Sequence, residues 1–455
     1  MTTGETTFQG IAVTELAERF GTPLFVYDGE VLERTYRDLR AVLPPAVDVF
    51  YSLKANPNIS VYALLRSLGA GAEVSSHAEL VTALRAGADP RDVIFLGPGK
   101  DAAELAACVE AGIHAVVCES VEELRRLDEL AAAAGPVRCR AMLRINPDFA
   151  TKGSGLAMGG KPRQFGIDLE VLRSARDVLA GLRHVELTGL HAYMGTRFLD
   201  HADVVHNTRE ILAAAERLSA ELGVPLGTVD FGGGLGVPYF ENEKALDVAA
   251  LGTGMHEVVA PFAERHPDCR LIMELGRYLT AWAGTYVVRA RYVKRSMGEW
   301  FVVADGGTNH HMAAVGVGSF VKRNFPVRHL GRPAAPAVRA YSVTGPLCTP
   351  NDVVAKKVGL PEVAPGDLLG VELSGAYGPT ASPGLFLSHG YPAEVLVHRG
   401  QAHLVRERDT LEDLLAKQRL VDLTAGAAPA ATAGSAAAEA GASAAGAAAP
   451  AGAVR

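Results

Sequence analysis

The stretch VDVFYSLKANPN, residues 47–58, ends a buried strand on a lysine. Residues 49–53 are strand formers, and Pro57 has no amide hydrogen with which to continue a sheet. The ammonium group of Lys54 is costly to remove from water, so its place after an apolar strand calls for a reason. For a single lysine, the commoner explanation is a charged end that reaches solvent from the strand terminus.

Seven further apolar runs follow, each separated from the next by a segment with helical apolar spacing. They cover residues 71–76, 92–97, 114–120, 139–147, 187–195, 227–234 and 271–277. Strands that alternate with helices predict a parallel sheet, and eight such units favour a (β/α)₈ barrel over a doubly wound open sheet. After residue 280 the helical pattern gives way to short strands, which we expect to be antiparallel and to form an all-β, Greek-key-like domain.

Four regions follow from this pattern. We expect an N-terminal segment associated with the β domain at residues 1–24, the barrel at 25–280, the β domain at 281–420 and a disordered tail at 421–455. From residue 424 the tail is almost entirely Ala and Gly with some Pro, Ser and Thr, and it has no amphipathic stripe with which to dock.

Composition excludes several classes of function. The 455 residues carry 44 basic and 51 acidic side chains, a net charge of −7, and no basic stripe that would bind nucleic acid. We find neither a secretory signal in MTTGETTFQG nor an apolar run long enough to span a membrane, so we expect a cytoplasmic protein. The five cysteines have no disulfide or zinc spacing. His310 and His311 would point to opposite faces of a strand, so we expect no metal.

Chemically notable side chains gather at the ends of the predicted barrel strands, where active sites of this fold lie. They are Lys54, Glu73, Arg144, His191, Asp230, Glu274 and Arg277, together with Gly232–Gly234. A desolvated lysine amine can form a Schiff base with an aldehyde, and pyridoxal phosphate is the obvious aldehyde.

Pyridoxal phosphate makes two further demands on the chain. The glycine loop DFGGGLG, residues 230–236, can offer backbone N–H groups to a phosphate, although such a turn alone also simply joins a strand to a helix. Glu274 can keep the pyridine nitrogen protonated, and its alternative is a structural ion pair with Arg277.

Five motifs resemble, in order and spacing, the fold-type III pyridoxal-phosphate decarboxylases, a family that includes the diaminopimelate and ornithine decarboxylases. They are YSLKANPN, DFGGGLG, ELGRYLTAWAG, GPLCTPND and SGAYG, and the similarity runs from about residue 20 to 410. The resemblance implies a barrel with a β domain, pyridoxal phosphate as cofactor, and a homodimer with shared active sites. A racemase on the same barrel and a non-catalytic regulatory relative are alternatives.

The resemblance also implies roles for individual residues. Lys54 would bind the cofactor covalently, and Cys348 would be a catalytic acid that reaches into the active site of the other subunit. The remaining cofactor-binding residues would be Glu73, Tyr193, Thr196, Gly234, Glu274, Gly276, Arg277 and Tyr377. Tyr193 stands where the family commonly has a histidine stacked on the ring, and tyrosine can still stack there. His191, two residues earlier, either supports the site or packs in the core.

The substrate is indicated by departures from the family pattern. Thr349 stands where relatives often have an acid that faces the distal ammonium of the substrate, which argues against diaminopimelate, lysine and ornithine. Residues 305–327 resemble a subgroup of secondary metabolism that includes the butirosin-pathway enzyme, which acts on a γ-glutamyl thioester of an acyl carrier protein. Arg277, Thr349 and Arg323 would then contact substrate. Diaminopimelate decarboxylation is the alternative.

A basic rim could receive such a carrier protein. Lys322, Arg323 and Arg328 lie close together in the sequence, and an acidic carrier would be attracted to them. A solvated charged face explains the three side chains equally well.

Overall fold

The computed structural model describes residues 4–135, 138–149, 153–154, 156–160, 162–315 and 323–423. The predicted disordered segment from residue 424 lies outside the described residues. By its internal contacts the chain divides into two units, Met1–Leu414 and Leu415–Arg455. Every element below belongs to the first unit, apart from the last residue of α12 (Leu411–Leu415).

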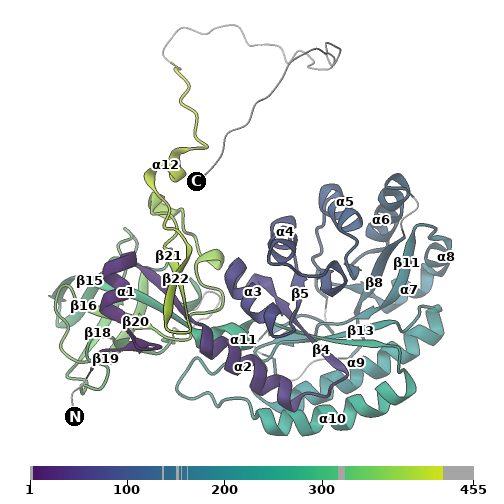
Figure 1. Ribbon diagram of the computed structural model, residues 1–455, viewed down its shortest axis with the longest axis horizontal. Coiled ribbons are helices and arrows are strands. Elements are labelled where there is room, and N and C mark those ends of the chain that lie inside the picture. Colours follow the sequence, from purple (N-terminus) through teal and green to yellow (C-terminus); the bar gives the residue numbers. More distant parts are fainter. Residues whose placement is uncertain are drawn as a thin grey trace, which may run out of the picture. The chain divides into compact units, whose positions relative to one another are not determined.

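Eight parallel strands close into a barrel, as the sequence predicts (Figure 1). They are β4 (Val47–Ser52), β5 (Gly71–Val74), β6 (Val93–Phe95), β7 (Ala115–Cys118), β8 (Cys139–Asn146), β11 (Val185–His191), β13 (Thr228–Gly233) and β14 (Arg270–Leu275). The pairing of β14 with β4 and of β7 with β8 closes the ring. The short β10 (Ile167–Asp168) pairs with β8, and β9 (Leu156–Ala157) pairs with β12 (Gly195–Thr196).

Helices connect the barrel strands and surround them (Figure 1). They are α2 (Gly29–Val42), α3 (Ile59–Ser67), α4 (His77–Arg85), α5 (Ala102–Ala111), α6 (Val121–Ala133), α7 (Leu169–Ser174), α8 (Arg176–Gly181), α9 (His201–Leu222), α10 (Val248–Arg265) and α11 (Arg277–Thr280). Polar caps begin most of the longer ones; Asp101 and Glu104 form a capping box on α5. In the described part of the chain no helix is long and apolar enough to cross a membrane.

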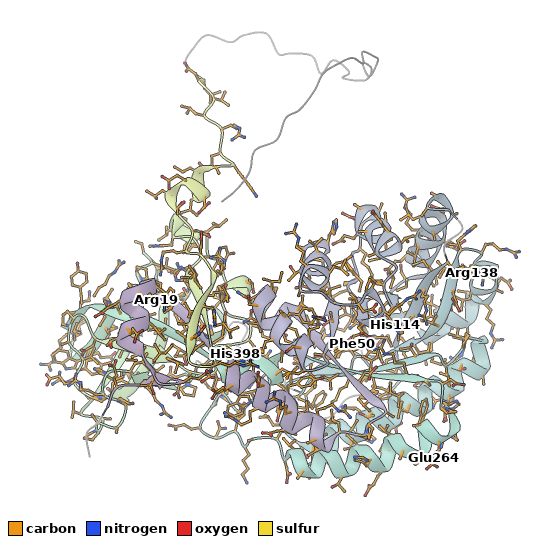
Figure 2. All side chains as sticks on the ribbon, viewed as in Figure 1. Arg19, Phe50, His114, Arg138, Glu264 and His398 are labelled. Atoms are coloured by element: carbon orange, nitrogen blue, oxygen red, sulfur yellow. The ribbon has the colours of Figure 1, made fainter. Side chains whose placement is uncertain are left out.

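The barrel interior is packed, and its N-terminal end is closed by ion pairs. An apolar cluster fills the inside: Phe50, Ile94, Leu96, Ala115, Val117, Met142 and Ile272. Below it Arg270 binds Asp48 and Asp92, each at 2.6 Å, and its guanidinium covers the Phe50 ring. His114 Nδ1 lies 3.5 Å from the Arg270 guanidinium, and Figure 2 labels His114 and Phe50 within the barrel. Only the opposite end, where the strands finish, is left for chemistry.

A second sheet forms the predicted β domain, with strand order β19-β18-β16-β15-β3-β21-β22 and with β20 and β17 paired beside β15. Its strands are β3 (Leu24–Asp28), β15 (Gly284–Ser296), β16 (Glu299–Ala304), β17 (Val327–His329), β18 (Arg339–Thr344), β19 (Val353–Leu360), β20 (Leu368–Val371), β21 (Ala393–His398) and β22 (Gln401–Arg406). We expected antiparallel strands throughout, but two pairings, β16 with β18 and β3 with β21, are parallel.

The N-terminal segment packs into this second sheet. After the small hairpin of β1 (Thr7–Phe8) and β2 (Ile11–Ala12), helix α1 (Val13–Phe20) buries Val13 and Leu16 against Val395 and Val397 of β21. Strand β3 then pairs with β15 and β21 before α2 enters the barrel. We keep the boundaries 1–24, 25–280 and 281–420 as a proposal, noting that the second sheet takes in β3 as far as Asp28.

A candidate active site at the barrel mouth

Lys54 lies at the C-terminal end of β4 and pairs with a carboxylate of the next strand. Its Nζ is 2.8 Å from Glu73 Oε2, and Glu73 is fully buried on β5. The register explains the pair, because Ser52 and Glu73 are direct neighbours across β4 and β5. The other oxygen of Glu73 accepts a hydrogen bond from Ser75 Oγ at 3.0 Å. The Lys54 side chain keeps 39% of its surface exposed, so its amine stays accessible.

The charge of Lys54 differs from our expectation. We expected burial to favour the neutral amine, and burial does act to lower the pKa of Lys54. The carboxylates of Glu73 and Glu274 oppose it and raise that pKa above its ordinary value. Without cofactor the amine is therefore an ammonium, and Glu73 is the nearest group to which its proton can pass.

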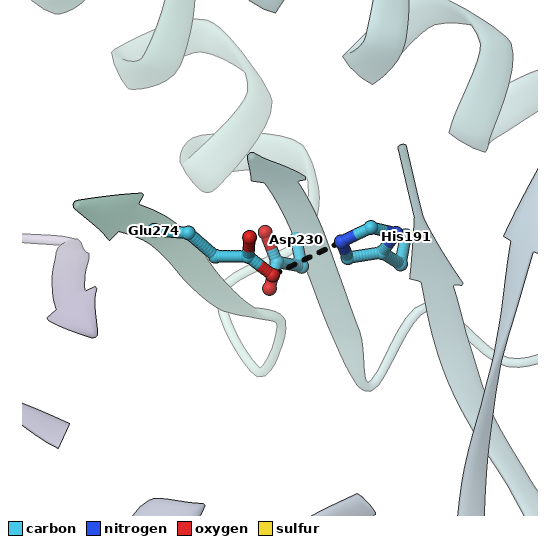
Figure 3. A group of neighbouring side chains, drawn as sticks. All are labelled: His191, Asp230 and Glu274. Atoms are coloured by element: carbon cyan, nitrogen blue, oxygen red, sulfur yellow. Dashed lines mark hydrogen bonds and ion pairs between the residues drawn. The ribbon is translucent and has the colours of Figure 1, made fainter. Parts of the chain in front are cut away.

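Three polar side chains on adjacent strands meet inside the mouth (Figure 3). His191 ends β11, Asp230 lies on β13 in register with it, and Glu274 lies on β14. His191 Nε2 is 3.0 Å from Glu274 Oε1, the contact that the dashed line marks. Asp230 Oδ1 accepts the Gly232 amide hydrogen at 2.8 Å, and the Asp230 carboxyl group also hydrogen-bonds to Glu274, whereas the buried His191 Nδ1 has no hydrogen-bond partner among the described residues.

The two carboxyl groups of this cluster are driven to opposite charge states. Burial and the neighbouring Glu274 raise the pKa of Asp230 well above its usual range. Burial alone would also raise the pKa of Glu274, but His191, Lys54 and Asp230 lower it. Two buried carboxyls this close cannot both ionise, so Glu274 holds the charge and Asp230 the proton. His191 Nε2 then donates to the Glu274 carboxylate.

The same cluster is the candidate metal site of the described residues, since its ligand atoms lie within 4.8 Å of one another. Two observations argue against a metal. His191 and Glu274 already bind each other, and a protonated Asp230 is a poor ligand. The expectation of no metal stays a prediction.

His310 and His311 lie in a turn after β16 and not on a strand, so our argument from opposite strand faces is wrong. His310 Nδ1 is 3.2 Å from the Tyr286 hydroxyl, and His311 Nε2 is 2.8 Å from Ser374 Oγ. Burial lowers the pKa of His310 to about 4 and that of His311 to about 3, so both rings are neutral. We interpret the two as hydrogen-bonded core residues of the β domain.

Tyr193 and the glycine loop form one wall of the mouth. The Tyr193 ring lies 6.0 Å from Lys54 Nζ, and a Cβ on Gly232 would come within 2.6 Å of that ring. Gly234 has φ +81° and passes so close to Gly195 that an added Cβ would stand 2.1 Å from its carbonyl oxygen. Thr196 follows Gly195 directly on β12. The structure thus brings the predicted residues Tyr193, Thr196 and Gly234 together.

Arg277 follows β14, the strand adjacent to β13, and Tyr377 lies beside it. The Arg277 guanidinium lies 4.5 Å from the centre of the Tyr377 ring and donates to the Tyr239 hydroxyl at 3.2 Å, while its buried Nε has no hydrogen-bond partner in the part of the chain that the structure describes. The Tyr377 amide donates to Ala55 O at 2.7 Å, which ties this loop of the β domain to the turn that carries Lys54. Gly276 also packs against Ala55: a Cβ added to Gly276 would lie only 2.7 Å from the Cβ of Ala55.

Cys348, Thr349 and Arg323 stand apart from this group. Cys348 is an exposed free thiol in the loop between β18 and β19, and Thr349 is partly exposed beside it. Among the described residues, no hydrogen bond or ion pair joins either of them to Lys54 or Glu274. Arg323 reaches the mouth only indirectly, through Phe240 and Tyr239. Lys322 of the predicted basic rim lies outside the described residues, and Arg328 pairs with Glu372 at 3.0 Å.

Tyr239 and Asp230 have structural roles that the sequence reasoning did not assign. Asp230 was noted only as a strand-end acid, and its partnership with Glu274 depends on strand order in space. Tyr239 lies in the loop VPYFENE, where nothing in the sequence marks it, yet it binds Arg277 and stacks on Phe325 with ring centres 4.2 Å apart.

Comparisons with known proteins agree with this geometry. Residues 30–281 match the model for the pyridoxal-binding domain of pyridoxal-dependent decarboxylases. The chain is 39% identical to the L-glutamyl-[BtrI acyl-carrier protein] decarboxylase of Niallia circulans over 89% of this chain and 96% of that protein. It is 33% identical to the diaminopimelate decarboxylase of Pseudomonas aeruginosa over 91% and 96%. The crystal structure of the M. jannaschii diaminopimelate decarboxylase superposes with a TM-score of 0.84 at 28% identity, over 92% and 97%.

Proposed function

Because the chain belongs to the family of pyridoxal-dependent decarboxylases, we propose that it removes the α-carboxyl group of a γ-glutamyl unit tethered as a thioester to an acyl carrier protein. The observation that carries this substrate is the 39% identity to a relative named for that activity, against 33% to the P. aeruginosa diaminopimelate decarboxylase over nearly the same length. The product would be a γ-aminobutyryl thioester of the kind used in aminoglycoside-type side chains, which places the enzyme in antibiotic biosynthesis.

The residues present fit pyridoxal phosphate. The amine of Lys54 is accessible, Glu274 is held as a buried carboxylate, and the close passage of Gly234 leaves no room for a side chain between the loop and its neighbours. When bound, the cofactor supplies an electron sink for the electron pair released as the bond from Cα to the carboxylate breaks.

We propose that the Glu274 carboxylate pairs with the ring nitrogen of the cofactor. An ionised carboxylate there would keep that nitrogen protonated, and the buried surroundings strengthen the interaction. His191 positions Glu274 through the 3.0 Å hydrogen bond, and the proton on Asp230 removes a competing negative charge. Of the two roles left open for His191, this contact supports that of a positioning residue.

We propose that Glu73 accepts a proton from Lys54 and returns it. The lysine must lose a proton before its amine can bind the cofactor aldehyde, and Glu73 Oε2 is 2.8 Å from Nζ. Glu73 would hold this proton close to Nζ and could return it to the amine. The Tyr193 side chain already faces Lys54, so it would cover one face of the cofactor ring.

We propose that residues from both groups at the barrel mouth bind the cofactor phosphate. Gly234 and Gly276 would offer backbone N–H groups, and Thr196 and Tyr377 would offer hydroxyls. Arg277 lies beside Tyr377, and its Nε, which has no hydrogen-bond partner among the described residues, can serve either the phosphate or the substrate carboxylate.

We propose that the enzyme works as a homodimer in which Cys348 completes the site of the partner subunit. In one chain this thiol is exposed and away from Lys54, as a residue that serves another subunit would be. Its role would be to donate the proton that replaces CO₂ on Cα, and Thr349 beside it would face the uncharged thioester end of the substrate.

A subunit-mixing experiment tests the shared site. Cys348→Ala alone should lower kcat on the order of 10²-fold, because a positioned proton donor is lost. Refolding it together with an equal amount of Lys54→Ala should restore about a quarter of wild-type activity, since half of the dimers would be mixed and each would hold one complete site. Cys269→Ala, a thiol at the closed end of the barrel, should change nothing. Mixtures without recovered activity would show that Cys348 does not act across a dimer.

A side-by-side substrate measurement tests the proposed reaction. CO₂ release should be fastest from the γ-glutamyl-loaded carrier protein, with kcat/KM at least about 10²-fold above free glutamate and free diaminopimelate. Thr349 gives the physical reason, because a neutral hydroxyl leaves the distal ammonium of diaminopimelate unpaired. Preference for diaminopimelate would overturn the substrate while leaving the cofactor assignment intact.

A further inference from the structure

A groove leads away from the barrel mouth on the side of Arg277. It has a volume of about 920 Å³ and runs between the loop of residues 238–243, which follows β13, and residues 323–328 and 357–359 of the β domain. Its size lies within the range of sites that hold small molecules, and it is far too narrow for a folded protein. None of the residues assigned above to the cofactor lines it.

Aromatic rings join this groove to the active site. Arg277 donates to the Tyr239 hydroxyl, Tyr239 stacks on Phe325, and Phe240 lies edge-on to Phe325 with ring centres 6.3 Å apart. Tyr239 and Phe325 are buried, whereas Arg323 two residues earlier is exposed. The groove therefore runs from the catalytic end of the barrel to the surface along a floor of rings.

Among the described residues, one cation that lines the groove has no ion pair. The other two lining cations are paired, Arg328 with Glu372 at 3.0 Å and Lys357 with Glu299 at 2.7 Å. Arg323 has no ion pair among the described residues, and its guanidinium lies 5.2 Å from the centre of the Phe240 ring. An arginine held over an aromatic ring keeps its donor edge free for an anion.

We propose that this groove receives the phosphopantetheine arm of the carrier-bound substrate, with Arg323 binding the phosphodiester and the rings of Tyr239, Phe240 and Phe325 contacting the amide chain. The inference rests on the proposed function. Charge complementarity selects this occupant: the arm has one anionic group at its outer end, an uncharged chain of flat amides, and its thioester at the inner end. Arg323 stands where the anionic group would lie, and the rings of Tyr239, Phe240 and Phe325 continue from it toward the barrel mouth.

Comparing three γ-glutamyl thioesters as substrates distinguishes contacts with the phosphopantetheine arm from contacts with the carrier protein. They are the loaded carrier protein, the free γ-glutamyl-phosphopantetheine, and the N-acetylcysteamine thioester, which lacks the phosphate and most of the arm. Arg323→Gln should raise KM about tenfold for the first two, because one charge-assisted contact is lost, and should leave their kcat unchanged. KM for the truncated thioester should not change. Arg339→Gln is the matched control, since Arg339 also lies over a ring, 4.1 Å from the centre of Trp300, away from the groove.

Each other outcome has a definite meaning. An unchanged KM for free γ-glutamyl-phosphopantetheine, or an equal rise for all three thioesters, overturns the assignment of the phosphate to Arg323. A rise confined to the loaded carrier shows that Arg323 contacts the carrier surface and also overturns it. If the wild-type enzyme decarboxylates none of the three thioesters, the proposed function itself fails and the groove assignment falls with it. Turnover of the truncated thioester upholds the proposed function whatever Arg323 does.

Discussion

Replacing Lys54 by alanine is expected to lower kcat by at least about 10³-fold, because Lys54 is the residue that we propose to hold the cofactor covalently. The loss should appear in kcat with saturating pyridoxal phosphate in the assay, so that weaker cofactor binding is not its cause. CO₂ release under single-turnover conditions is the measurement, since it reports the chemical step without product release.

Lys54→Arg separates the chemistry of Lys54 from its charge. A guanidinium keeps the positive charge beside Glu73, which is fully buried, but it is never deprotonated and cannot bind an aldehyde. We expect Lys54→Arg to unfold at nearly the wild-type temperature and to be as inactive as Lys54→Ala. Activity in the arginine variant would mean that only the cation beside Glu73 is needed.

Glu274→Gln is expected to lower kcat on the order of 10²-fold, because the site loses a fixed negative charge aimed at the ring nitrogen. KM should change little, since Glu274 is assigned to the cofactor and not to the substrate. The absorption band of the bound cofactor should also shift, because its ring nitrogen would no longer be held protonated. Steady-state CO₂ release and the visible spectrum of the holoenzyme are the two measurements.

Glu394→Gln is the matched control for this prediction. Glu394 is likewise a buried strand carboxylate with hydrogen-bond donors around it, the Tyr27 hydroxyl at 2.8 Å and the Asn58 amide at 3.3 Å, but it lies on β21 of the second sheet. We expect kcat of this variant to stay within about twofold of wild type. Equal losses in the two variants would assign the effect of Glu274→Gln to packing.

The barrel could be predicted from the sequence because its strands are buried on both faces and read as apolar runs. Each predicted run contains or overlaps its observed strand. The second sheet was harder for a physical reason. Strand β19 carries Lys356 and Lys357 at exposed positions, so its sequence does not read as a strand. The parallel pairing of β16 with β18 depends on a long connection whose path no local pattern records.

The candidate site divides in the same way. Lys54, Glu73 and Glu274 were identified because a charged residue at the end of an apolar strand stands out in the sequence. The charge state of Lys54 could not be predicted from the sequence, because it depends on carboxylates that only the closed barrel brings near. Asp230 and His191 could not be assigned for the same reason: their register across β11 and β13 sets their contacts. The roles of Cys348 and Thr349 depend on a second subunit and stay predictions.

The central claim is that Lys54 holds the cofactor, and reduction of the holoenzyme with borohydride tests it most directly. Peptide mass mapping of the reduced protein should find one cofactor adduct, on the peptide that contains Lys54. Lys100, buried in its ion pair with Glu123, is the internal comparison and should stay unmodified. An adduct on any other lysine, or none at all, would contradict the account.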